Sequence, residues 1–460
     1  MRPNDHRSPP APRAHLRTWL LGPGLGLGLL ACNGHASSAD GNGQTDAPSE
    51  RIAELESRVV STPSPAPEPD PPAPEPEPEP TPLRPEELPE GYLHFAGACD
   101  PGERVTIAAV GDVLLHEELQ VQAYAAPERH LALWGGVVDL LSAADVTYAN
   151  LEGPMAAGVT RSGKQIRDPG LVYDNVVYSA YPRFNFHPSL AESLVKSGVD
   201  VVSTANNHSL DRHAIGVDKT LEALDAASLL HTGTRRQSAS ARLPWHVMTE
   251  TRGVRLAWLA CAKNTNQIPD DEDQVLYCTR NSDQVVKLVK RLAREDDIDG
   301  IIVTPHWGHE YQTAPRKQQQ ELAHRLAEAG ATAIIGSHPH VTQPWEKYAT
   351  EDGREVFIHY SLGNFASHQT DLPRRSSVIL YVGVTKAPDG RARVNGVRYV
   401  PIHVRQDGDD FRTEAIDRGD GADDSRALLV EMYGRYNLLP PDAPLETSGH
   451  CRAGFEFPAR

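Results

Sequence analysis

The sequence predicts an α/β fold for the part of the chain that follows residue 93. From residue 104 onward, short β-branched apolar runs alternate with amphipathic segments, which is typical of strands connected by helices. Strands are predicted at residues 105–110, 145–149, 199–204, 301–304, 332–335 and 356–360. Helices are predicted at residues 189–197, 217–227, 283–294 and 316–330. This order predicts a sheet layer with helices on both faces.

Two further elements are predicted near the C-terminus. Residues 376–405 contain two alternating runs around the turn-rich segment APDGRAR, which is typical of a β-hairpin that extends or flanks the sheet. A last helix is predicted at residues 426–436. The sequence shows no internal repeat, so residues 93–460 are predicted to form one domain.

The first 32 residues predict export and a lipid anchor. Four arginines accompany the apolar stretch at residues 19–30, which has the layout of a secretory signal and is too short to span a membrane as a helix. The stretch ends in Leu29-Leu30-Ala31-Cys32, which resembles the bacterial lipobox. The resemblance implies cleavage before Cys32 and attachment of a lipid to its sulfur, so that the protein is held at a membrane of the cell envelope. The alternative is an ordinary signal peptide with an incidental cysteine.

Residues 33–92 are predicted to form an extended linker. Residues 61–90 contain 13 prolines, interleaved with glutamates. Such a composition buries too little apolar surface to fold, and it favours the polyproline conformation. A segment of that length spans about 90 Å at the polyproline rise, so the linker would hold the domain away from the membrane.

The charge of the chain argues against a nucleic-acid partner. The formal net charge is −17 at pH 7, and the predicted domain is acidic even without the linker. Nucleic-acid binding depends on Lys and Arg side chains that displace the counterions of the phosphates. The composition therefore disfavours that class of partner.

Apart from Cys32, the chain contains four cysteines. An even number favours disulfides in a protein that is exported to an oxidising compartment. Of the three possible connectivities, the favoured one joins Cys99 to Cys451, the two ends of the domain, and Cys261 to Cys278, which closes a short loop. Buried free thiols are the alternative.

A polar cluster follows each of the predicted strands. The clusters are GD at 111–112, NLE at 150–152, NNH at 206–208, HWG at 306–308, GSHPH at 336–340 and SLGN at 361–364. Loops that leave the carboxyl ends of neighbouring strands converge in one crevice, which is where open α/β sheets bind their ligands. The sequence therefore predicts one site at this end of the strands.

The residue types in these clusters predict a metal site. They offer an Asp, a Glu, an Asn amide oxygen and three imidazoles, a set that suits Mn, Zn or Fe better than Ca. Two divalent ions need a shared carboxylate and about three further ligands each, which this set nearly supplies. Taken singly, most of these residues would be capping, surface or core residues. Their joint placement after successive strands indicates a site with two ions.

The stretches GDVLLH, NLEG, ANNHSLD, PHWGHEY, GSHPHVTQP and SLGNF resemble, in this order, the CapA family of poly-γ-glutamate capsule proteins. The resemblance covers roughly residues 104–370. It implies a calcineurin-like metallophosphoesterase fold, a layered sandwich of sheets flanked by helices. It also implies the following ligands: Asp112 and His340 for the first metal, Asn207, His306 and His338 for the second, and Glu152 as the bridge. His208 resembles the general acid of the family.

One position departs from the pattern of the broader phosphoesterases. Their first motif is Asp-x-His, whereas this chain has Leu114 in place of the histidine and His116 two residues later. The first metal site therefore lacks one expected ligand. Further residues are candidates for contacting substrate or for orienting the ligands: Asn150, His116, Glu310 and Asn364.

Three functions fit these features. The first is a lipid-anchored protein of the cell envelope that acts in the synthesis, export or anchoring of an anionic polymer such as poly-γ-glutamate, with a metal-dependent hydrolase centre. The second is an exported metal-dependent phosphoesterase, which the ligand set favours and Leu114 disfavours. The third is a polymer-binding module without catalysis, against which the three histidines argue.

Overall fold

The computed structural model describes residues 83–237, 244–455 and 457, which all belong to one compact unit, Pro76–Arg460. The predicted signal peptide, Cys32 and most of the predicted linker lie outside these residues. The packed part begins before residue 93, because the backbone N–H of Leu83 donates to the carbonyl oxygen of His450 (3.2 Å) and Tyr92 is buried. No helix in these described ranges is long and apolar enough to cross a bilayer.

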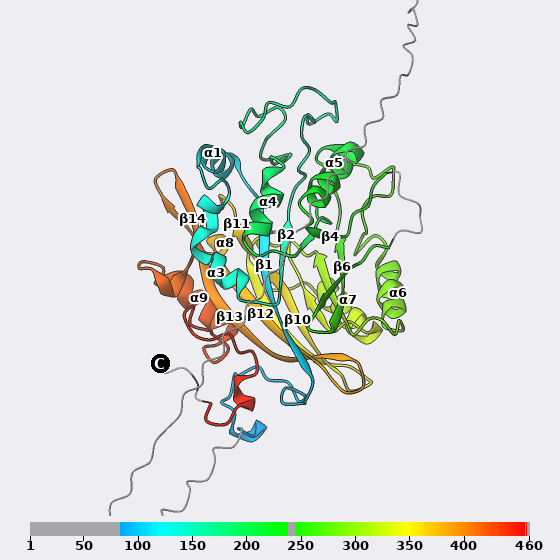
Figure 1. Ribbon diagram of the computed structural model, residues 1–460, viewed down its shortest axis with the longest axis vertical. Coiled ribbons are helices and arrows are strands. Elements are labelled where there is room, and N and C mark those ends of the chain that lie inside the picture. The colour runs from blue at the N-terminus through cyan, green and yellow to red at the C-terminus, as the bar shows by residue number, and fades with distance from the viewer. Residues whose placement is uncertain (1–82, 238–243, 456, 458–460) are drawn as a thin grey trace, which may run out of the picture. The chain divides into compact units, whose positions relative to one another are not determined.

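Two β-sheets form the centre of the domain (Figure 1). The larger sheet has the strand order β14-β13-β12-β1-β2-β3-β4, with β11 paired to β1, and the smaller has the order β5-β6-β7-β8-β10-β9. The strands of the larger sheet are β1 (Glu103–Val113), β2 (Val146–Leu151), β3 (Val201–Ser203), β4 (Leu230–Thr232), β11 (Asn364–Ala366), β12 (Ser376–Lys386), β13 (Ala392–Asp407) and β14 (Asp410–Ala415). Those of the smaller sheet are β5 (Val247–Thr251), β6 (Val254–Ala262), β7 (Gly300–His306), β8 (Ala333–Ile335), β9 (Thr342–Ala349) and β10 (Glu355–Leu362).

In the larger sheet, neighbouring strands among β1, β2, β3 and β4 are parallel. In the smaller sheet, neighbouring strands among β6, β7, β8 and β10 are parallel. The hairpin strands β12, β13 and β14 and the edge strands β5 and β9 are antiparallel. The carboxyl ends of the parallel strands therefore lie at a common end in each sheet, as the sequence pattern predicts.

Most helices cover the outer faces of the two sheets, whereas the last one packs against the core between the sheets. They are α1 (Glu117–Ala125), α2 (Leu131–Trp134), α3 (Val138–Ser142), α4 (Ser189–Lys196), α5 (His213–Ala226), α6 (Ser282–Leu292), α7 (Lys317–Ala329), α8 (Leu372–Arg375) and α9 (Asp423–Tyr433). Apolar side chains of α1 to α5 pack on the larger sheet, and those of α6 and α7 pack on the smaller sheet. Figure 1 shows α6 and α7 on the opposite side of the molecule from α3 and α9.

The two sheets pack face to face around a shared apolar core. Strand β2 illustrates how alternation builds it, because Val146 and Tyr148 point into this core whereas Ala149 and Leu151 point to the helix-covered face. Asn150 continues the first set and therefore faces the space between the sheets. In β7, Ile302 points into the same core, and His306, four residues later at the end of the strand, faces the same side. The C-terminal ends of the two sheets thus present polar side chains to each other.

The predicted α/β class is confirmed, and the middle layer consists of two sheets, as the family resemblance implies, rather than one. All six predicted strands, the four predicted helices, the hairpin and the last helix are present, with ends that differ by a few residues. Strand β6 and the short strands β4, β5, β9, β11 and β14 are not among the predicted elements. Both favoured disulfides are also present: Cys99 is bonded to Cys451 and Cys261 to Cys278.

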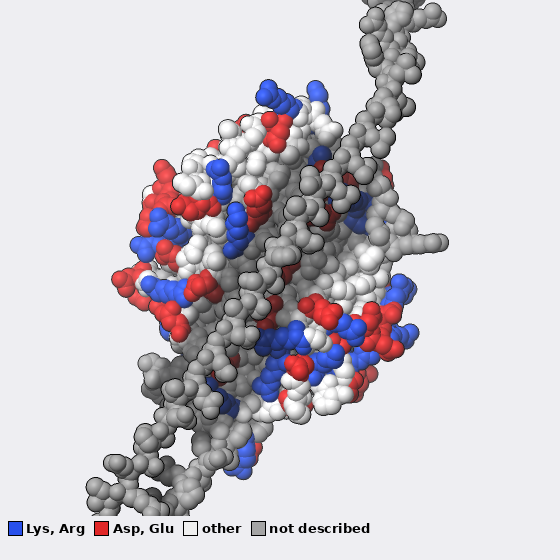
Figure 2. Space-filling model, viewed as in Figure 1, with Lys and Arg blue, Asp and Glu red and all other residues white. Residues whose placement is uncertain are grey.

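The surface carries both signs of charge. On the visible part of the face in Figure 2, Lys and Arg side chains are interspersed with Asp and Glu side chains. Many of them form exposed ion pairs, such as Arg418 with Asp139 (2.6 Å) and Arg426 with Asp417 (2.6 Å). Exposed pairs of this kind contribute little to stability individually, about 0–1 kcal/mol each.

Candidate metal centre

Six predicted ligands converge between the two sheets, at the carboxyl ends of the strands. Asp112 lies in β1, Glu152 directly follows β2, Asn207 follows β3 and His306 ends β7. The loop that joins β8 to β9 supplies His338 and His340.

The backbone beneath the site is closely packed. A Cβ atom on Gly111 would lie 1.9 Å from the carbonyl oxygen of Gly363, so only glycine lets β1 and β11 approach this closely. In this arrangement Asp112 lies opposite Asn364 in parallel register. The two strands therefore place a carboxylate and an amide side by side.

The converging side chains form two groups that share Glu152. One consists of Asp112, Glu152 and His340, and the other of Glu152, His306 and His338. Within each group, one potential ligand atom from every residue lies within 4.8 Å of the others, and all five side chains are buried. The nearest carboxylate oxygen of Glu152 is 3.4 Å from Nε2 of His306 and 3.8 Å from Nε2 of His340. Glu152 thus lies between the two groups, where the sequence prediction places a bridge.

Asn207 joins the second group. Its Oδ1 lies 2.8 Å from Nε2 of His306, and the same nitrogen lies 3.1 Å from Nδ1 of His338. Three potential ligand atoms from three separate segments of the chain therefore face one point, as ligands of a common ion do. The Nδ2 group of Asn150 donates to Asp112 (2.7 Å) and lies 3.2 Å from Nδ1 of His306. Asn150 therefore contacts one residue of each group.

The donor set suits a divalent metal. Both carboxylate oxygens of Glu152 and Oδ1 of Asn150 are buried and have no hydrogen-bond donor among the described residues. Leaving a buried carboxylate without any partner costs several kcal/mol, on the order of the penalty for an unpaired ion, so such a group normally binds a cation. Imidazole, amide and carboxylate together match the ligands of borderline to hard divalent ions. The residues present therefore fit a metal.

The two groups differ in their protonation. Burial lowers the pKa of His306 to about 3 and places the pKa of His338 well below its usual value, so both rings are neutral, the form that binds a metal. Burial would also lower the pKa of His340, but the charges of Glu152 and Asp112 outweigh it and raise that pKa to about 9. Burial and the charge of Asp112 raise the pKa of Glu152. The two acidic side chains thus favour a positive charge in the group of His340, as a bound cation would provide.

The loop that carries His338 and His340 has an unusual backbone. Both histidines have positive φ angles, 100° and 58°, which non-glycine residues rarely adopt. Gly336 opens this loop so close to the carbonyl oxygen of Tyr360 that a Cβ atom would lie 2.2 Å from it. Strain of this kind costs about 1–3 kcal/mol per residue and occurs where function requires a side chain in one place.

His208 lies at the edge of the centre and is held by Asp211. Nδ1 of His208 lies 2.7 Å from Oδ2 of Asp211, which also accepts the backbone N–H of Phe184 (2.6 Å). Burial would lower the pKa of His208, but the charge of Asp211 and its hydrogen bond outweigh burial, and the pKa is raised. The contact with Asp211 fixes the orientation of the ring and occupies Nδ1, so Nε2 is the ring nitrogen that Asp211 does not bind. Asp211 was not predicted, although it follows His208 by three residues within the stretch ANNHSLD.

The other candidate residues occupy different places. Asn364 is in the centre, with Oδ1 3.1 Å from Nδ1 of His340. Glu310 is exposed at the mouth of the site. His116 belongs to neither group, since its Nδ1 lies 3.0 Å from the carbonyl oxygen of Leu114 and its ring packs edge-on against Phe184 at 5.3 Å. His116 therefore does not take the place of the histidine that the sequence lacks at residue 114.

Lys263 was missed because it follows the unpredicted strand β6. Its backbone N–H donates to the carbonyl oxygen of His306 (2.8 Å), and its ammonium group donates to that of Gly308. Burial lowers the pKa of Lys263. The side chain therefore lies beside the second group and brings a cation to the mouth of the site.

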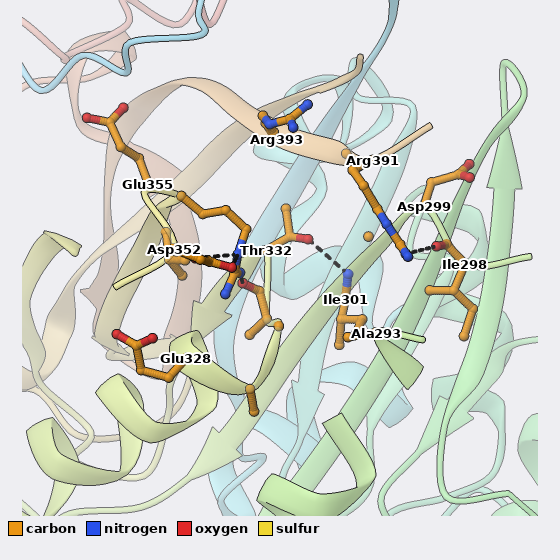
Figure 3. Close-up of a pocket in the computed structure, with 17 residues that line it drawn as sticks. Ala293, Ile298, Asp299, Ile301, Glu328, Thr332, Asp352, Glu355, Arg391 and Arg393 are labelled. Atoms are coloured by element: carbon orange, nitrogen blue, oxygen red, sulfur yellow. Dashed lines mark hydrogen bonds and ion pairs between the residues drawn. The ribbon is translucent and has the colours of Figure 1, made fainter. Parts of the chain in front are cut away.

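A pocket of about 360 Å³ lies at the opposite ends of the strands. Figure 3 shows Arg391 reaching the carbonyl oxygen of Ile298 (3.3 Å) and Thr332 bonded to the backbone N–H of Ile301 (3.0 Å). Gly300, at the start of β7, also lines this pocket, whereas His306 ends the same strand. The pocket is therefore separate from the metal centre.

Comparison with known proteins places the chain in a family. Residues 106–369 match the family described as bacterial capsule synthesis protein PGA_cap. The capsule biosynthesis protein CapA of Bacillus anthracis is 26% identical over 69% of this chain and 71% of that protein. The PGA biosynthesis protein CapA of Bacillus subtilis is 28% identical over 45% of this chain and 53% of that protein, so the match spans about half of its length.

Solved structures add a weak likeness. The NAD nucleotidase NadN of Haemophilus influenzae is 13% identical and aligns with a TM-score of 0.42, over 74% of this chain and 57% of that one. A TM-score this low carries no argument about function. The matched segment, 106–369, contains every residue of the two groups that share Glu152. The chain therefore belongs to the family of bacterial capsule synthesis proteins, PGA_cap.

Proposed function

We propose that this protein is a lipid-anchored protein of the cell envelope that acts on an anionic capsule polymer, such as poly-γ-glutamate, with a centre of two divalent ions. The observation that carries the proposal is the pair of buried ligand groups that share Glu152. Its relatives in the two Bacillus species are named for capsule or PGA biosynthesis. A polymer of the envelope is reached most directly by a domain tethered there, which is the role proposed for Cys32.

The proposed ligand roles follow the geometry of the two groups. Asp112 and His340 would hold one ion, His306, His338 and Asn207 would hold the other, and Glu152, which both groups share, would serve both. Bound divalent ions supply Lewis acidity and an activated water at such a centre. Asn150 orients Asp112 and His306 through its amide group.

His208 is the proposed general acid. Asp211 accepts the Nδ1 hydrogen of the ring, which leaves Nε2 to carry the proton that a leaving oxygen or nitrogen receives. The charge of Asp211 stabilises the protonated ring, so the acid is available near neutral pH. A positioned acid of this kind contributes about 100- to 10,000-fold in rate.

Metal content tests the centre. We expect the full chain, purified in detergent with added Mn or Zn, to hold two ions by elemental analysis. His338→Ala removes a ligand of one group only, and His340→Ala a ligand of the other, so each variant should lose one ion. Glu152→Gln should weaken both sites, because the bridge serves both. His231→Ala is the control, since His231 pairs with Asp225 (3.0 Å) outside the centre. Wild-type protein without stoichiometric metal contradicts the proposal.

Turnover separates this function from that of an exported phosphoesterase, which the imidazole-rich ligand set also favours. The metal-loaded chain is assayed on poly-γ-glutamate and on phosphate mono- and diesters, with His208→Ala as the inactive comparison. Cleavage of the polymer supports the proposal, and cleavage of the phosphoesters alone supports the alternative. A metal-loaded protein that binds polymer and cleaves neither substrate would be a binding module.

The anchor has a separate test. We expect Cys32→Ala to move the protein from the membrane fraction to the soluble fraction of the producing cells. If the variant fractionates like the wild type, the lipid anchor is rejected, whereas the metal centre is unaffected by that outcome.

A further inference from the structure

Tyr311 is an exposed aromatic residue in a strained conformation at the mouth of the metal centre. It is 47% exposed, whereas most of the described aromatic residues of this protein are buried. Its φ angle is 64°, in the left-handed region that is unfavourable for a tyrosine. A residue that is both strained and exposed gains nothing from core packing, so the strain indicates a use for the ring at this place.

The backbone holds Tyr311 against the loop of the metal ligands. Its N–H donates to the carbonyl oxygen of Pro339 (2.7 Å), which lies between His338 and His340. The centroid of the tyrosine ring lies 6.1 Å from that of His340. The ring therefore borders the group that contains Asp112, Glu152 and His340.

A guanidinium group stacks on this ring. The Cζ atom of Arg374 lies over Tyr311 at 4.6 Å from the ring centroid, and its Nε pairs with Asp371, the residue that precedes α8. Stacking on an aromatic face leaves the edge of a guanidinium group available for hydrogen bonds. With Nε directed at Asp371, the available edge is the one formed by the two terminal nitrogens.

The backbone of Arg374 is also fixed to the metal centre. The Nδ2 group of Asn364 donates to the carbonyl oxygen of Arg374 (2.9 Å), and Oδ1 of Asn364 lies 3.1 Å from Nδ1 of His340. Tyr311 lies in the loop after β7 and Arg374 lies in α8, yet each is bound to the same side of the centre. Such a preorganised pair loses little entropy when it binds a ligand.

We propose that Tyr311 and Arg374 form a subsite that binds an anionic group of the substrate, a carboxylate or a phosphate, next to the bond that lies at the metal centre. The guanidinium edge donates hydrogen bonds to two oxygens of the anion, and the ring packs against the apolar part of the neighbouring unit. This inference rests on the proposed function and deepens it. The substrate is then a chain with repeated anionic groups, rather than a monoester with a single terminal anion.

Binding tests the subsite without requiring turnover. Fluorescently labelled poly-γ-glutamate oligomers and polyphosphate are titrated with the full chain in detergent, with metal and after removal of metal, and Kd is read from anisotropy. We expect Arg374→Gln to weaken binding of the preferred polymer about tenfold or more, because it removes charge-assisted hydrogen bonds. Arg374→Lys, which keeps the charge but not the planar edge, should recover only part of the loss. Tyr311→Leu should also weaken binding, because it removes the platform.

A matched control comes from another stacked arginine. Arg435 lies over Tyr436 at 4.7 Å from its ring centroid, away from the metal centre. Arg435→Gln should leave Kd unchanged within about twofold, and thermal melts of all variants report whether they fold. Equal affinities of wild type and Arg374→Gln for both polymers would overturn the proposal, whichever polymer binds more tightly.

A kinetic comparison distinguishes failure of the subsite from failure of the proposed function. If the centre cleaves bis(p-nitrophenyl) phosphate, which has no second anion, Arg374→Gln should raise KM for the polymer by a larger factor than it lowers kcat/KM on this small substrate. An equal loss on both substrates would assign Arg374 to the centre as a whole and reject the subsite. If no substrate is cleaved at all, the proposed hydrolysis fails, while the difference in Kd still decides the subsite.

Discussion

Two histidines that are two residues apart take opposite protonation states in the metal centre. His338 faces other histidines and Lys263, and burial dominates its lowered pKa. His340 faces Glu152 and Asp112, whose charges raise its pKa to about 9. An ion that binds at His340 must therefore displace a proton near neutral pH, whereas an ion that binds at His338 need not. At the scale of single residues, the surrounding charges distinguish two sites that have the same ligand type.

Replacing Asp211 by asparagine tests the role of His208. The charge of Asp211 is what raises the pKa of His208 against burial, so its loss lowers that pKa. A general acid must be protonated, and a lower pKa therefore moves the alkaline limit of activity to lower pH. We expect Asp211→Asn to lower kcat by about tenfold or more at pH 8 and by less at pH 6, measured as a pH–rate profile on the metal-loaded chain.

The control for this substitution is a second Asp–His pair. Asp225 pairs with His231 at 3.0 Å, on the surface and outside the metal centre. Asp225→Asn should leave the pH–rate profile unchanged. A profile of Asp211→Asn that is lower by the same factor at every pH would show that Asp211 only supports the local structure.

At the scale of elements, the sequence predicts the parallel strands and the loops after them. Each of the six predicted parallel strands consists of an apolar, mostly β-branched run that ends at a polar cluster, and topology then requires the clusters to meet at one edge. This is why Asp112, Glu152, Asn207, His306 and His340 could be predicted from one sequence. The division of the strands between two sheets could not be derived from the pattern, because alternation reports which face is buried and not which strand lies beside it.

Strand β6 illustrates a second limit. Almost all residues of Val254–Ala262 are buried, so the strand shows no alternation of polar and apolar residues. A short apolar run of that kind cannot be distinguished from a buried helix by periodicity alone. Because β6 was missed, Lys263 at its end was missed as well. No sequence pattern predicts the role of Arg374, since its stacking on Tyr311 joins α8 to a loop that is distant in sequence.

The close contact of β1 with β11 predicts the effect of Gly111→Ala. The new Cβ atom would meet the carbonyl oxygen of Gly363, so the strands must separate. Overpacking of this kind costs about 1–3 kcal/mol in the free energy of unfolding. The shift also moves Asp112, so we expect the group with His340 to lose metal before the group with His338. Urea unfolding and elemental analysis measure the two effects.

Gly136→Ala is the matched substitution for this test. No atom outside its immediate neighbours lies within 4 Å of a Cβ built on Gly136, and its φ angle is not in the left-handed region. This variant should change stability by no more than about 0.5 kcal/mol and should keep both ions. If Gly111→Ala behaves in the same way, the strand contact does not position the centre.

At the scale of the whole molecule, buried neutral histidines predict sensitivity to acid. His359 is fully buried in β10 among Trp345, Phe357 and Tyr433, and neither ring nitrogen has a hydrogen-bond partner among the described residues. Burial lowers its pKa to about 3. Below the pKa of the unfolded chain, about 6.5, the unfolded state binds a proton that the folded state refuses. The contribution of neutral, buried His359 to the free energy of unfolding is therefore fully present above pH 6.5, and it is lost as the pH falls toward 3.

The measurement is urea unfolding of wild type and His359→Phe between pH 7.5 and 5. Phenylalanine keeps the aromatic packing and cannot bind the proton. We expect the difference in the free energy of unfolding to move in favour of the variant by up to about 1.4 kcal/mol per pH unit below pH 6.5. A difference that stays constant over this range would mean that folded His359 binds a proton as readily as unfolded His359, so that burial does not lower its pKa.

The two disulfides differ in the length of chain they close and in their exposure, and both differences predict their behaviour in a reductant. Cys99 and Cys451 are 352 residues apart, and Cys99 is exposed, whereas Cys261 and Cys278 are 17 residues apart and fully buried. Thiol attack requires access, so mild dithiothreitol under native conditions should reduce Cys99–Cys451 first, as followed by alkylation and mass spectrometry. The partly reduced chain should lose about 3–5 kcal/mol in the free energy of unfolding, since this bond restrains nearly the whole unfolded domain. Earlier reduction of the buried bond, or no loss of stability, would mean that the domain ends are held mainly by the packing of residues 83–100 on the C-terminal segment.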